Sequence, residues 1–221
     1  MCGRFALHSP MGKVAERTGI EVPLEHWSPR YNVAPGTHPP SVNGRSGKPV
    51  VEQCLWGFKP GWAASDAPRP INARAEKVAK SPYFRDAFRH CRCLIPADGW
   101  FEWKVTEAGK VPHYITHKAG DLLCFAGVYD PGGESHSPSF AIITQPAAGA
   151  LRDIHDRMPV VLTQGSYRAW LDPELSDDAQ IKSVTKPLPV DDLLAHPVST
   201  AVNRVTNDYP ELLDQIACNA G

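Results

Sequence analysis

The most distinctive reactive groups in the sequence lie at its start, where Cys2 follows Met1. Aminopeptidases remove an initial methionine when the next side chain is small, so the mature chain would begin with Cys2. An N-terminal cysteine carries an amine and a thiol with ordinary pKa values of about 8 and about 8.5, so fractions of both are nucleophilic near neutral pH. Such an aminothiol can condense with an aldehyde to an imine and close to a thiazolidine, or it can transfer acyl groups. Met-Cys alone is equally consistent with an ordinary residue near a chain end.

Glu102 is the first candidate for proton transfer. In the segment DGWFEWK (residues 98–104), strand alternation places Trp100, Glu102 and Lys104 on one face and Phe101 and Trp103 on the other. Desolvation beside tryptophan would raise the carboxyl pKa and suit it to proton transfer near pH 7. A glutamate at a strand edge, paired with Lys104, is the alternative.

His155 and the pair Asn72 and Arg74 are the other candidates. His155 lies in LRDIHDRMP (residues 151–159), where neighbouring acids could orient the imidazole and Arg157 could hold an anion. Asn72 and Arg74 are two residues apart, so an extended backbone would direct both to the same side. We find no glycine-rich phosphate loop, HExxH motif or metal-binding cluster, and we expect neither a metal nor a cofactor.

Charge is unevenly distributed along the chain. Residues 1–104 contain 15 Lys and Arg against 9 Asp and Glu, whereas residues 105–221 contain 8 against 15. Residues 69–92 contain seven basic side chains and two acidic ones. This composition indicates a positive surface that can hold phosphates, with a solvated helix face as the alternative.

Length and composition indicate one domain over residues 1–221. The chain is 42% hydrophobic, which suffices for one core, and its six cysteines are scattered as expected for reduced core thiols. No apolar run approaches the ~20 residues that span a bilayer, and the N-terminus lacks the pattern of a secretory signal. We therefore expect a monomeric cytoplasmic protein, nucleoid-associated if bacterial, with no membrane partner.

Two helices and several turns are predicted in the first part of the chain. Ser9-Pro10 predicts a helix capped by Ser9 that ends near Gly19, and Ser81-Pro82 predicts a second helix with apolar residues 83, 84, 87 and 88 on one side. Residues 21–49 are rich in proline and glycine and predict a loop or hairpin. A strand follows over residues 50–56 and closes in a turn that carries Trp62.

The second part of the chain is predominantly β-structure. Strands are predicted over 94–96 and 100–105, joined by a turn at 97–99, and over 113–117, 122–128, 140–144 and 159–162. Short helices are predicted after Ser166 and over 177–184 and 210–216. These elements favour an α+β fold: a single compact domain with a strongly twisted, antiparallel, barrel-like β-sheet core and short peripheral helices.

Seven segments in order resemble the SOS response-associated peptidase (SRAP) family, the abasic-site processing proteins. They are residues 1–5 (MCGRF), 30–36 (RYNVAPG), 56–62 (WGFKPGW), 71–76 (INARAE), 96–103 (PADGWFEW), 154–159 (IHDRMP) and 198–200 (VST). The resemblance implies a protein of DNA damage repair and the SOS response that binds single-stranded DNA at abasic sites. It further implies a covalent thiazolidine crosslink through Cys2 that shields the lesion, with peptidase or lyase-like chemistry and removal of Met1.

The resemblance also implies individual roles. Cys2 would be the nucleophile, Asn72 would position it, Glu102 would transfer protons, and His155 would assist opening of the deoxyribose. The DNA contacts implied are Arg4, Asn32, Arg74 and Arg157, with Pro35 and Trp62 as an apolar wedge between bases.

Two other functions fit parts of the sequence. An N-terminal-nucleophile amidohydrolase of glutaminase type also begins Met-Cys-Gly, but it would give the basic residues 69–92 no role. A non-catalytic binder of single-stranded nucleic acid would use the arginines and tryptophans without bond formation. Cysteine-dependent ammonia release would identify the first, and DNA binding unchanged by Cys2→Ala would identify the second.

Overall fold

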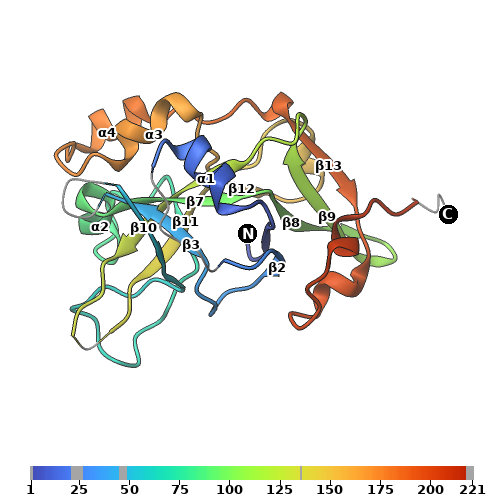
Figure 1. Cartoon of the computed structure of the whole chain (residues 1–221), viewed down its shortest axis with the longest axis horizontal. Helices are drawn as coiled ribbons and strands as arrows, with labels where there is room; N and C mark the ends of the chain where they lie inside the picture. The colour runs from blue at the N-terminus through green and yellow to red at the C-terminus, as the bar shows by residue number, and fades with distance from the viewer. Residues whose placement is uncertain (1, 21–26, 45–48, 135, 218–221) are drawn as a thin grey trace.

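Two β-sheets form the centre of the molecule in the computed structural model, which describes residues 2–20, 27–44, 49–134 and 136–217 (Figure 1). The first sheet has five strands in the order β13-β9-β8-β1-β2. Their bounds are β1 Phe5–Leu7, β2 Arg30–Val33, β8 Gly99–Thr106, β9 Gly109–His117 and β13 Leu193–Pro197. All neighbouring strands in this sheet are antiparallel.

The second sheet has eight strands among the described residues, six of them in the order β12-β11-β10-β7-β3-β4. Their bounds are β3 Pro40–Asn43, β4 Val50–Gln53, β7 Arg92–Ala97, β10 Leu123–Asp130, β11 Ser139–Pro146 and β12 Arg157–Pro159. Two short strands, β5 Leu55–Trp56 and β6 Asn72–Arg74, pair with β11 in parallel. β11 therefore brings together β6 and β12, which are distant in sequence.

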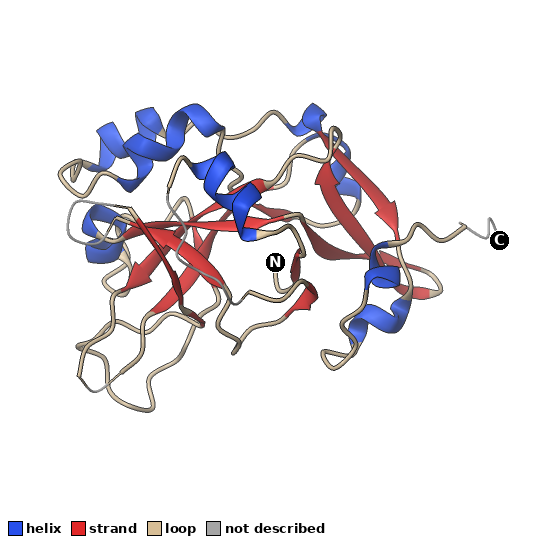
Figure 2. Ribbon diagram, in the orientation of Figure 1, coloured by secondary structure: helices blue, strands red, loops and turns tan. Residues whose placement is uncertain are grey.

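Short helices lie around the sheets (Figure 2). The α-helices are α1 Met11–Thr18, α2 Arg85–His90, α3 Tyr167–Leu171 and α4 Asp178–Val184. The 3-10 helices are η2 Gly149–Asp153, η3 Gln164–Ser166, η4 Val190–Asp192, η5 Thr200–Asn203 and η6 Pro210–Leu213. Together with the nearly closed, barrel-like sheet, they confirm the predicted α+β fold. None of the helices formed by the described residues has the length and apolar character needed to cross a membrane.

Strand alternation distributes the apolar side chains over three clusters. Trp100 of β8 and Phe125 of β10 lie in the cluster that both sheets share, with ring centroids 5.8 Å apart. Phe101, next along β8, lies in another cluster with Val202 and Leu212 from the C-terminal segment. The second sheet is covered by helices on its other face, where Phe88 and Trp170 pack. Because β10 is buried on both faces, its sequence is a continuous apolar run without alternation.

The predicted turn at residues 97–99 is not a hairpin. β7 pairs with β10 and β3 in the second sheet, whereas β8 pairs with β1 and β9 in the first, so the chain changes sheets at Asp98. The predicted cap at Ser9 is also wrong, because its hydroxyl donates to the Asp98 carboxylate and Pro10 precedes α1 without a side-chain cap. The partners that decided both points, the paired strands at Asp98 and the Asp98 carboxylate at Ser9, lie far away in the sequence.

Other predicted boundaries shift by a few residues. α1 ends at Thr18, and Gly19 directly after it has a φ of 70°, as expected of a glycine that ends a helix. α2 begins at Arg85 without a side-chain cap, so Ser81 does not start it. The strand predicted over 50–56 divides into β4 and β5, and residues 161 and 162 form only isolated bridges. Within the predicted loop, β2 and β3 form, while residues 21–26 and 45–48 lie outside the described residues.

Candidate active site

The pairing of β1 with β8 places Cys2 beside Glu102. Phe5 pairs with Trp100 and Ala6 with Gly99, and the N–H of Phe101 donates to the carbonyl oxygen of Arg4 at 3.0 Å. Because the two strands are antiparallel, the residues that precede Phe5 lie beside the residues that follow Trp100, which include Glu102. The N-terminal segment is thus positioned by a backbone ladder.

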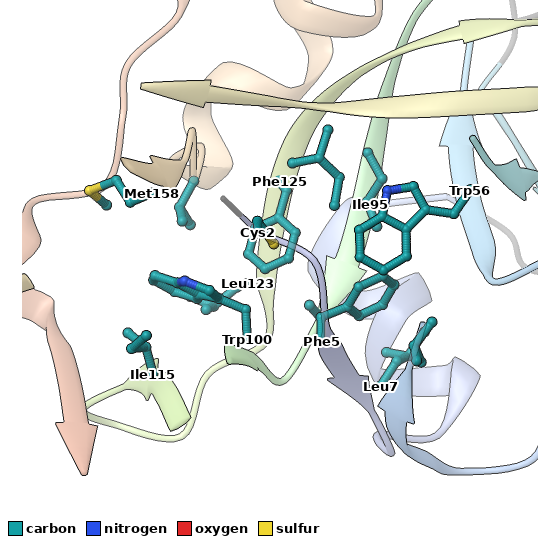
Figure 3. Close-up of a cluster of buried hydrophobic side chains, with 14 of the residues drawn as sticks. Cys2, Phe5, Leu7, Trp56, Ile95, Trp100, Ile115, Leu123, Phe125 and Met158 are labelled. Carbon is teal, nitrogen blue, oxygen red and sulfur yellow. The ribbon is translucent and has the colours of Figure 1, made fainter. Parts of the chain in front are cut away.

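Cys2 is fully buried in the cluster between the sheets, beside Phe125 and Trp100 (Figure 3). Burial raises the thiol pKa well above its ordinary value, and the nearby negative charge of Glu102 raises it further. The ordinary thiol pKa assumed from the sequence therefore does not apply in the chain that retains Met1. In this chain the nitrogen of Cys2 also belongs to a peptide bond, so neither the amine nor the thiolate is available.

Glu102 is only 3% exposed on β8. Desolvation raises its carboxyl pKa to about 7, as the alternation of β8 beside Trp100 led us to expect. Its carboxylate oxygen Oε2 lies 3.9 Å from Nε2 of His155, a contact that the sequence alternative with Lys104 did not anticipate. A carboxyl with a pKa near 7 is present in both protonation states at neutral pH, so it can give or accept a proton.

The two ring nitrogens of His155 have different neighbours. Nε2 faces Glu102, and Nδ1 faces the backbone of Arg157. Nδ1 lies 2.9 Å from the backbone nitrogen of Arg157, 3.2 Å from its carbonyl oxygen and 2.9 Å from the Asp156 carboxylate, so it can accept or donate according to the tautomer. Desolvation lowers the imidazole pKa, which favours the neutral ring. The segment before β12 thus directs Nε2 of a neutral imidazole toward Glu102.

Asn72 connects the second sheet to the N-terminal segment. It pairs with Ile142 of β11, and its Nδ2 donates to the carbonyl oxygen of Cys2 at 2.9 Å. Its Oδ1 is buried and accepts no hydrogen bond from the residues that the structure describes. A buried acceptor without a donor is costly unless a ligand supplies one.

Arg74 and Arg157 lie near each other because their strands flank β11. Arg74 is exposed at the end of β6, where it pairs with Thr144 of β11. Arg157 is mostly buried, and its Nη1 and Nη2 donate to the two carboxylate oxygens of Glu76 at 2.6 and 3.0 Å. Nη2 also donates to the carbonyl oxygen of Thr144 at 2.6 Å. In this conformation Arg74 is open to a phosphate and Arg157 is occupied.

Arg4 and Asn32 form a network with the C-terminal segment. Nη1 of Arg4 donates to Oδ1 of Asn32 at 2.8 Å and to the carbonyl oxygen of Val202 at 2.9 Å. Asn32 is fully buried, and its Nδ2 donates to the carbonyl oxygens of Val202, Arg204 and Asn207. In this conformation Asn32 positions Arg4 and cannot itself reach DNA.

Pro35 and Trp62 are exposed on turns, as an apolar wedge requires. Pro35 precedes Gly36, whose φ of 82° closes the turn after β2. Trp62 is 66% exposed, and its ring meets Tyr83 edge-on at 5.8 Å. The Trp62 turn is held by Asp130, which accepts the backbone N–H of Gly61 at 2.9 Å. An exposed aromatic ring on a fixed turn suits base stacking.

The basic residues between 69 and 92 do not all form a phosphate surface. Arg92 is 3% exposed and donates to carbonyl oxygens of the chain, including that of Trp170 at 2.7 Å. Arg89 pairs with Asp178 of α4 at 3.0 Å. The exposed basic residues of the run are Arg69, Arg74, Lys77, Lys80 and Arg85.

The described cysteines and acids offer no metal centre. No group of three or more His, Cys, Asp or Glu side chains that could hold an ion occurs within the described ranges. The five cysteines of the described residues form no disulfide bonds; they are Cys2, Cys54, Cys91, Cys93 and Cys124. The reactive groups that the structure places at this site are the thiol of Cys2, the carboxyl of Glu102, the imidazole of His155 and the amide of Asn72.

Sequence reasoning missed Glu76 and Thr144, which hold Arg157. Glu76 lies in the same segment as Asn72 and Arg74, but nothing in that segment indicates a partner 81 residues away. The shared neighbour β11 makes the contact, and strand order is not readable from one sequence. A conserved acid opposite a conserved arginine would be the signal to seek in an alignment.

Comparisons with known proteins identify relatives of this chain. The family model described as SOS response associated peptidase (SRAP) matches residues 1–205. The abasic site processing protein YoqW of Bacillus subtilis is 36% identical, covering 97% of this chain and 99% of the relative. The abasic site processing protein YedK of Escherichia coli is 35% identical, covering 98% and 100%.

A solved structure shares the architecture. A protein from Bacteroides thetaiotaomicron superposes with a TM-score of 0.84 at 27% identity, covering 98% of this chain and all of that one. The family model and the curated relatives each extend over nearly the whole chain, including every segment that carries the site. The chain therefore belongs to the SOS response associated peptidase (SRAP) family.

Proposed function

We propose that, after removal of Met1, this protein binds abasic sites in single-stranded DNA and forms a thiazolidine crosslink through Cys2. The names of its relatives support the processing of abasic sites. The observation that carries the covalent step is the β1–β8 pairing, which brings the second residue of the chain to Glu102 and His155. An N-terminal cysteine beside two proton-transfer groups is the arrangement that aldehyde capture needs.

The crosslink would form in two steps, imine formation and ring closure. The ring-opened sugar presents an aldehyde, and the freed amine of Cys2 adds to its carbonyl carbon and expels one water to give an imine. The thiol of Cys2 then adds to the imine carbon, and its proton passes to the nitrogen. One aldehyde and one aminothiol thus give one thiazolidine and one water, with no change of oxidation state. The ring resists hydrolysis better than the open imine does.

Glu102 and His155 would move the protons in these steps. Glu102, with a carboxyl pKa of about 7, can protonate the leaving hydroxyl and then accept the proton of the thiol. The neutral imidazole of His155 can assist opening of the sugar by proton transfer at Nε2, which faces Glu102. The buried Oδ1 of Asn72 can accept a hydrogen bond from the freed amine, which would satisfy it.

The burial of Cys2 adds a requirement. Since the thiol is fully buried in the chain that carries Met1, the sugar can reach it only if trimming or DNA binding opens the segment before β1. Exposed groups on the surface of the protein can hold the strand meanwhile. Arg74, Lys77 and Lys80 offer positive charge, and Trp62 offers a stacking surface.

A crosslinking assay tests the proposal. Trimmed protein mixed with a uracil-excised single-stranded oligonucleotide should give a conjugate that survives denaturation and whose mass is the sum of both components less one water. Cys2→Ala should abolish the stable conjugate, whereas Cys91→Ala, which alters a half-buried thiol elsewhere, should leave the yield unchanged. Protein that retains Met1 should give none.

Two outcomes would contradict the proposal. Equal conjugate yield from Cys2→Ala would assign the covalent bond to another group. Cys2-dependent ammonia release from glutamine without any conjugate would identify a glutaminase-type amidohydrolase instead.

A further inference from the structure

We propose that Glu76 is the resident counter-anion of Arg157 and gives up that guanidinium to a phosphate when single-stranded DNA binds. The inference rests on the proposed function, because it takes single-stranded DNA as the ligand. It assigns to Glu76 control over DNA affinity, exerted through the exchange of one anion for another.

The geometry of the pair is that of an occupied anion site. Both Nη atoms of Arg157 donate to Glu76, at 2.6 and 3.0 Å, which is the two-pronged arrangement that a phosphate also accepts. The Arg157 side chain is 11% exposed and that of Glu76 is 47% exposed. The carboxylate therefore lies between the guanidinium and the solvent, where an incoming phosphate would have to lie.

The guanidinium has a second anchor that would hold it in place after the exchange. Nη2 donates to the carbonyl oxygen of Thr144 at 2.6 Å, and the backbone N–H of Arg157 donates to His155. Neither contact involves Glu76. Displacement of the carboxylate would thus leave Arg157 positioned, with its outward N–H groups open.

Arg74 makes the exchange favourable for a polyanion in particular. It is exposed at the end of β6, and its charge acts on Glu76 together with that of Arg157. The single carboxylate of Glu76 makes its hydrogen bonds to Arg157, and Arg74 stays open to a second anion. A strand supplies a phosphate for each and is held by other groups as well, so it can displace a half-exposed ion pair.

The test measures affinity for an intact single-stranded oligonucleotide, so that no covalent step contributes. Dissociation constants are determined by fluorescence anisotropy over a series of salt concentrations for wild type, Glu76→Gln and Glu107→Gln. Glu107 is an exposed glutamate in the turn between β8 and β9, and its substitution changes net charge equally.

Glu76→Gln should bind several-fold more tightly at low salt. Its plot of log affinity against log salt should keep a slope close to that of wild type, because Arg157 contacts a phosphate in both proteins and the substitution removes only the cost of displacing the carboxylate. Glu107→Gln should retain the wild-type affinity. Adding Arg157→Gln to Glu76→Gln should remove the gain and make the slope shallower by about 0.7, the increment for one phosphate contact in a single strand.

Several results would overturn the inference. An unchanged affinity in Glu76→Gln, or a gain that persists without Arg157, would make the pair a purely structural contact. In wild type the hydrogen bonds from Arg157 hold the carboxyl pKa of Glu76 at about 2, so DNA binding should raise the pH at which carbon NMR detects protonation of this carboxyl. An identical titration in both states would also overturn it. If wild type shows no binding at all, the proposed function falls as well.

Discussion

Glu102 owes its reactivity to its surroundings. Burial raises its carboxyl pKa from the ordinary 4.5 to about 7, so the folded chain binds this proton more tightly than the unfolded chain does. The resulting stabilisation is complete below about pH 4.5 and is lost as pH rises through about 7. A group tuned for proton transfer at neutral pH therefore lowers the stability of the fold at that same pH.

The pH dependence of unfolding tests this tuning. Relative to Glu102→Gln, the unfolding free energy of wild type should fall by on the order of 3 kcal/mol between pH 4.5 and pH 8, at 1.36 kcal/mol per pKa unit. Urea unfolding at several pH values measures it, and Glu107→Gln serves as the control that should parallel wild type. Parallel curves for wild type and Glu102→Gln would show that the carboxyl titrates normally.

The sequence allowed some features of single residues to be predicted, but not their partners. The burial of Glu102 and the extended backbone of Asn72 and Arg74 follow from local alternation, and the structure has both. The occupation of Arg157 by Glu76 and the burial of Asn32 could not be predicted. Each depends on a contact between segments that only the strand order brings together.

At the scale of elements, Asp98 fixes the junction that positions Cys2. Its buried carboxylate accepts the backbone N–H groups of His8 at 2.7 Å and Ser9 at 2.8 Å, as well as the Ser9 hydroxyl. Its own backbone N–H donates to Ala6 at 2.8 Å. The end of β1 is thereby tied to the point where the chain passes from β7 to β8.

Removing this carboxylate should destabilise the protein. Asp98→Ala leaves two backbone N–H groups without their acceptor, and an unsatisfied buried group costs about 1–3 kcal/mol, so we expect a loss of about 2–4 kcal/mol. Urea unfolding measures the loss. Asp66→Ala, at an exposed aspartate, should change stability by less than about 0.5 kcal/mol. Equal effects from the two variants would contradict the assigned role of Asp98.

The type of most elements was predictable, whereas their connections were not. The apolar runs of β10 and β11 and the helix α4 follow from composition and from Asp177, whose carboxylate caps α4. The edge strand β13 was missed because its sequence, LLAHP, is short and contains no β-branched residue. The chain changes from one sheet to the other at Asp98 because β7 and β8 pair with strands that are distant in the sequence, so the neighbouring residues do not reveal it.

At the scale of the molecule, the C-terminal segment, residues 198–217, packs against the first sheet and hydrogen-bonds Arg4. Val202 and Leu212 pack against Phe101, while Asp208 accepts the backbone N–H of Tyr31 at 2.6 Å. Asn32 is the central connection, since its amide group bonds Arg4 on one side and three carbonyl oxygens of residues 202–207 on the other. The two ends of the chain thus meet at one buried amide.

Because of these hydrogen bonds, substitution of Asn32 can distinguish a structural role of this residue from a DNA-binding role. If Asn32 holds the C-terminal segment, Asn32→Ala should lower the unfolding free energy by about 3 kcal/mol, because it removes four hydrogen bonds from a fully buried position. Amide hydrogen exchange in residues 199–208 should also accelerate. Asn203→Ala, at an exposed asparagine of the same segment, should cost less than about 1 kcal/mol. Reduced affinity for single-stranded DNA with unchanged stability and exchange would instead show that Asn32 contacts the nucleic acid, which would require β2 and the C-terminal segment to separate on binding.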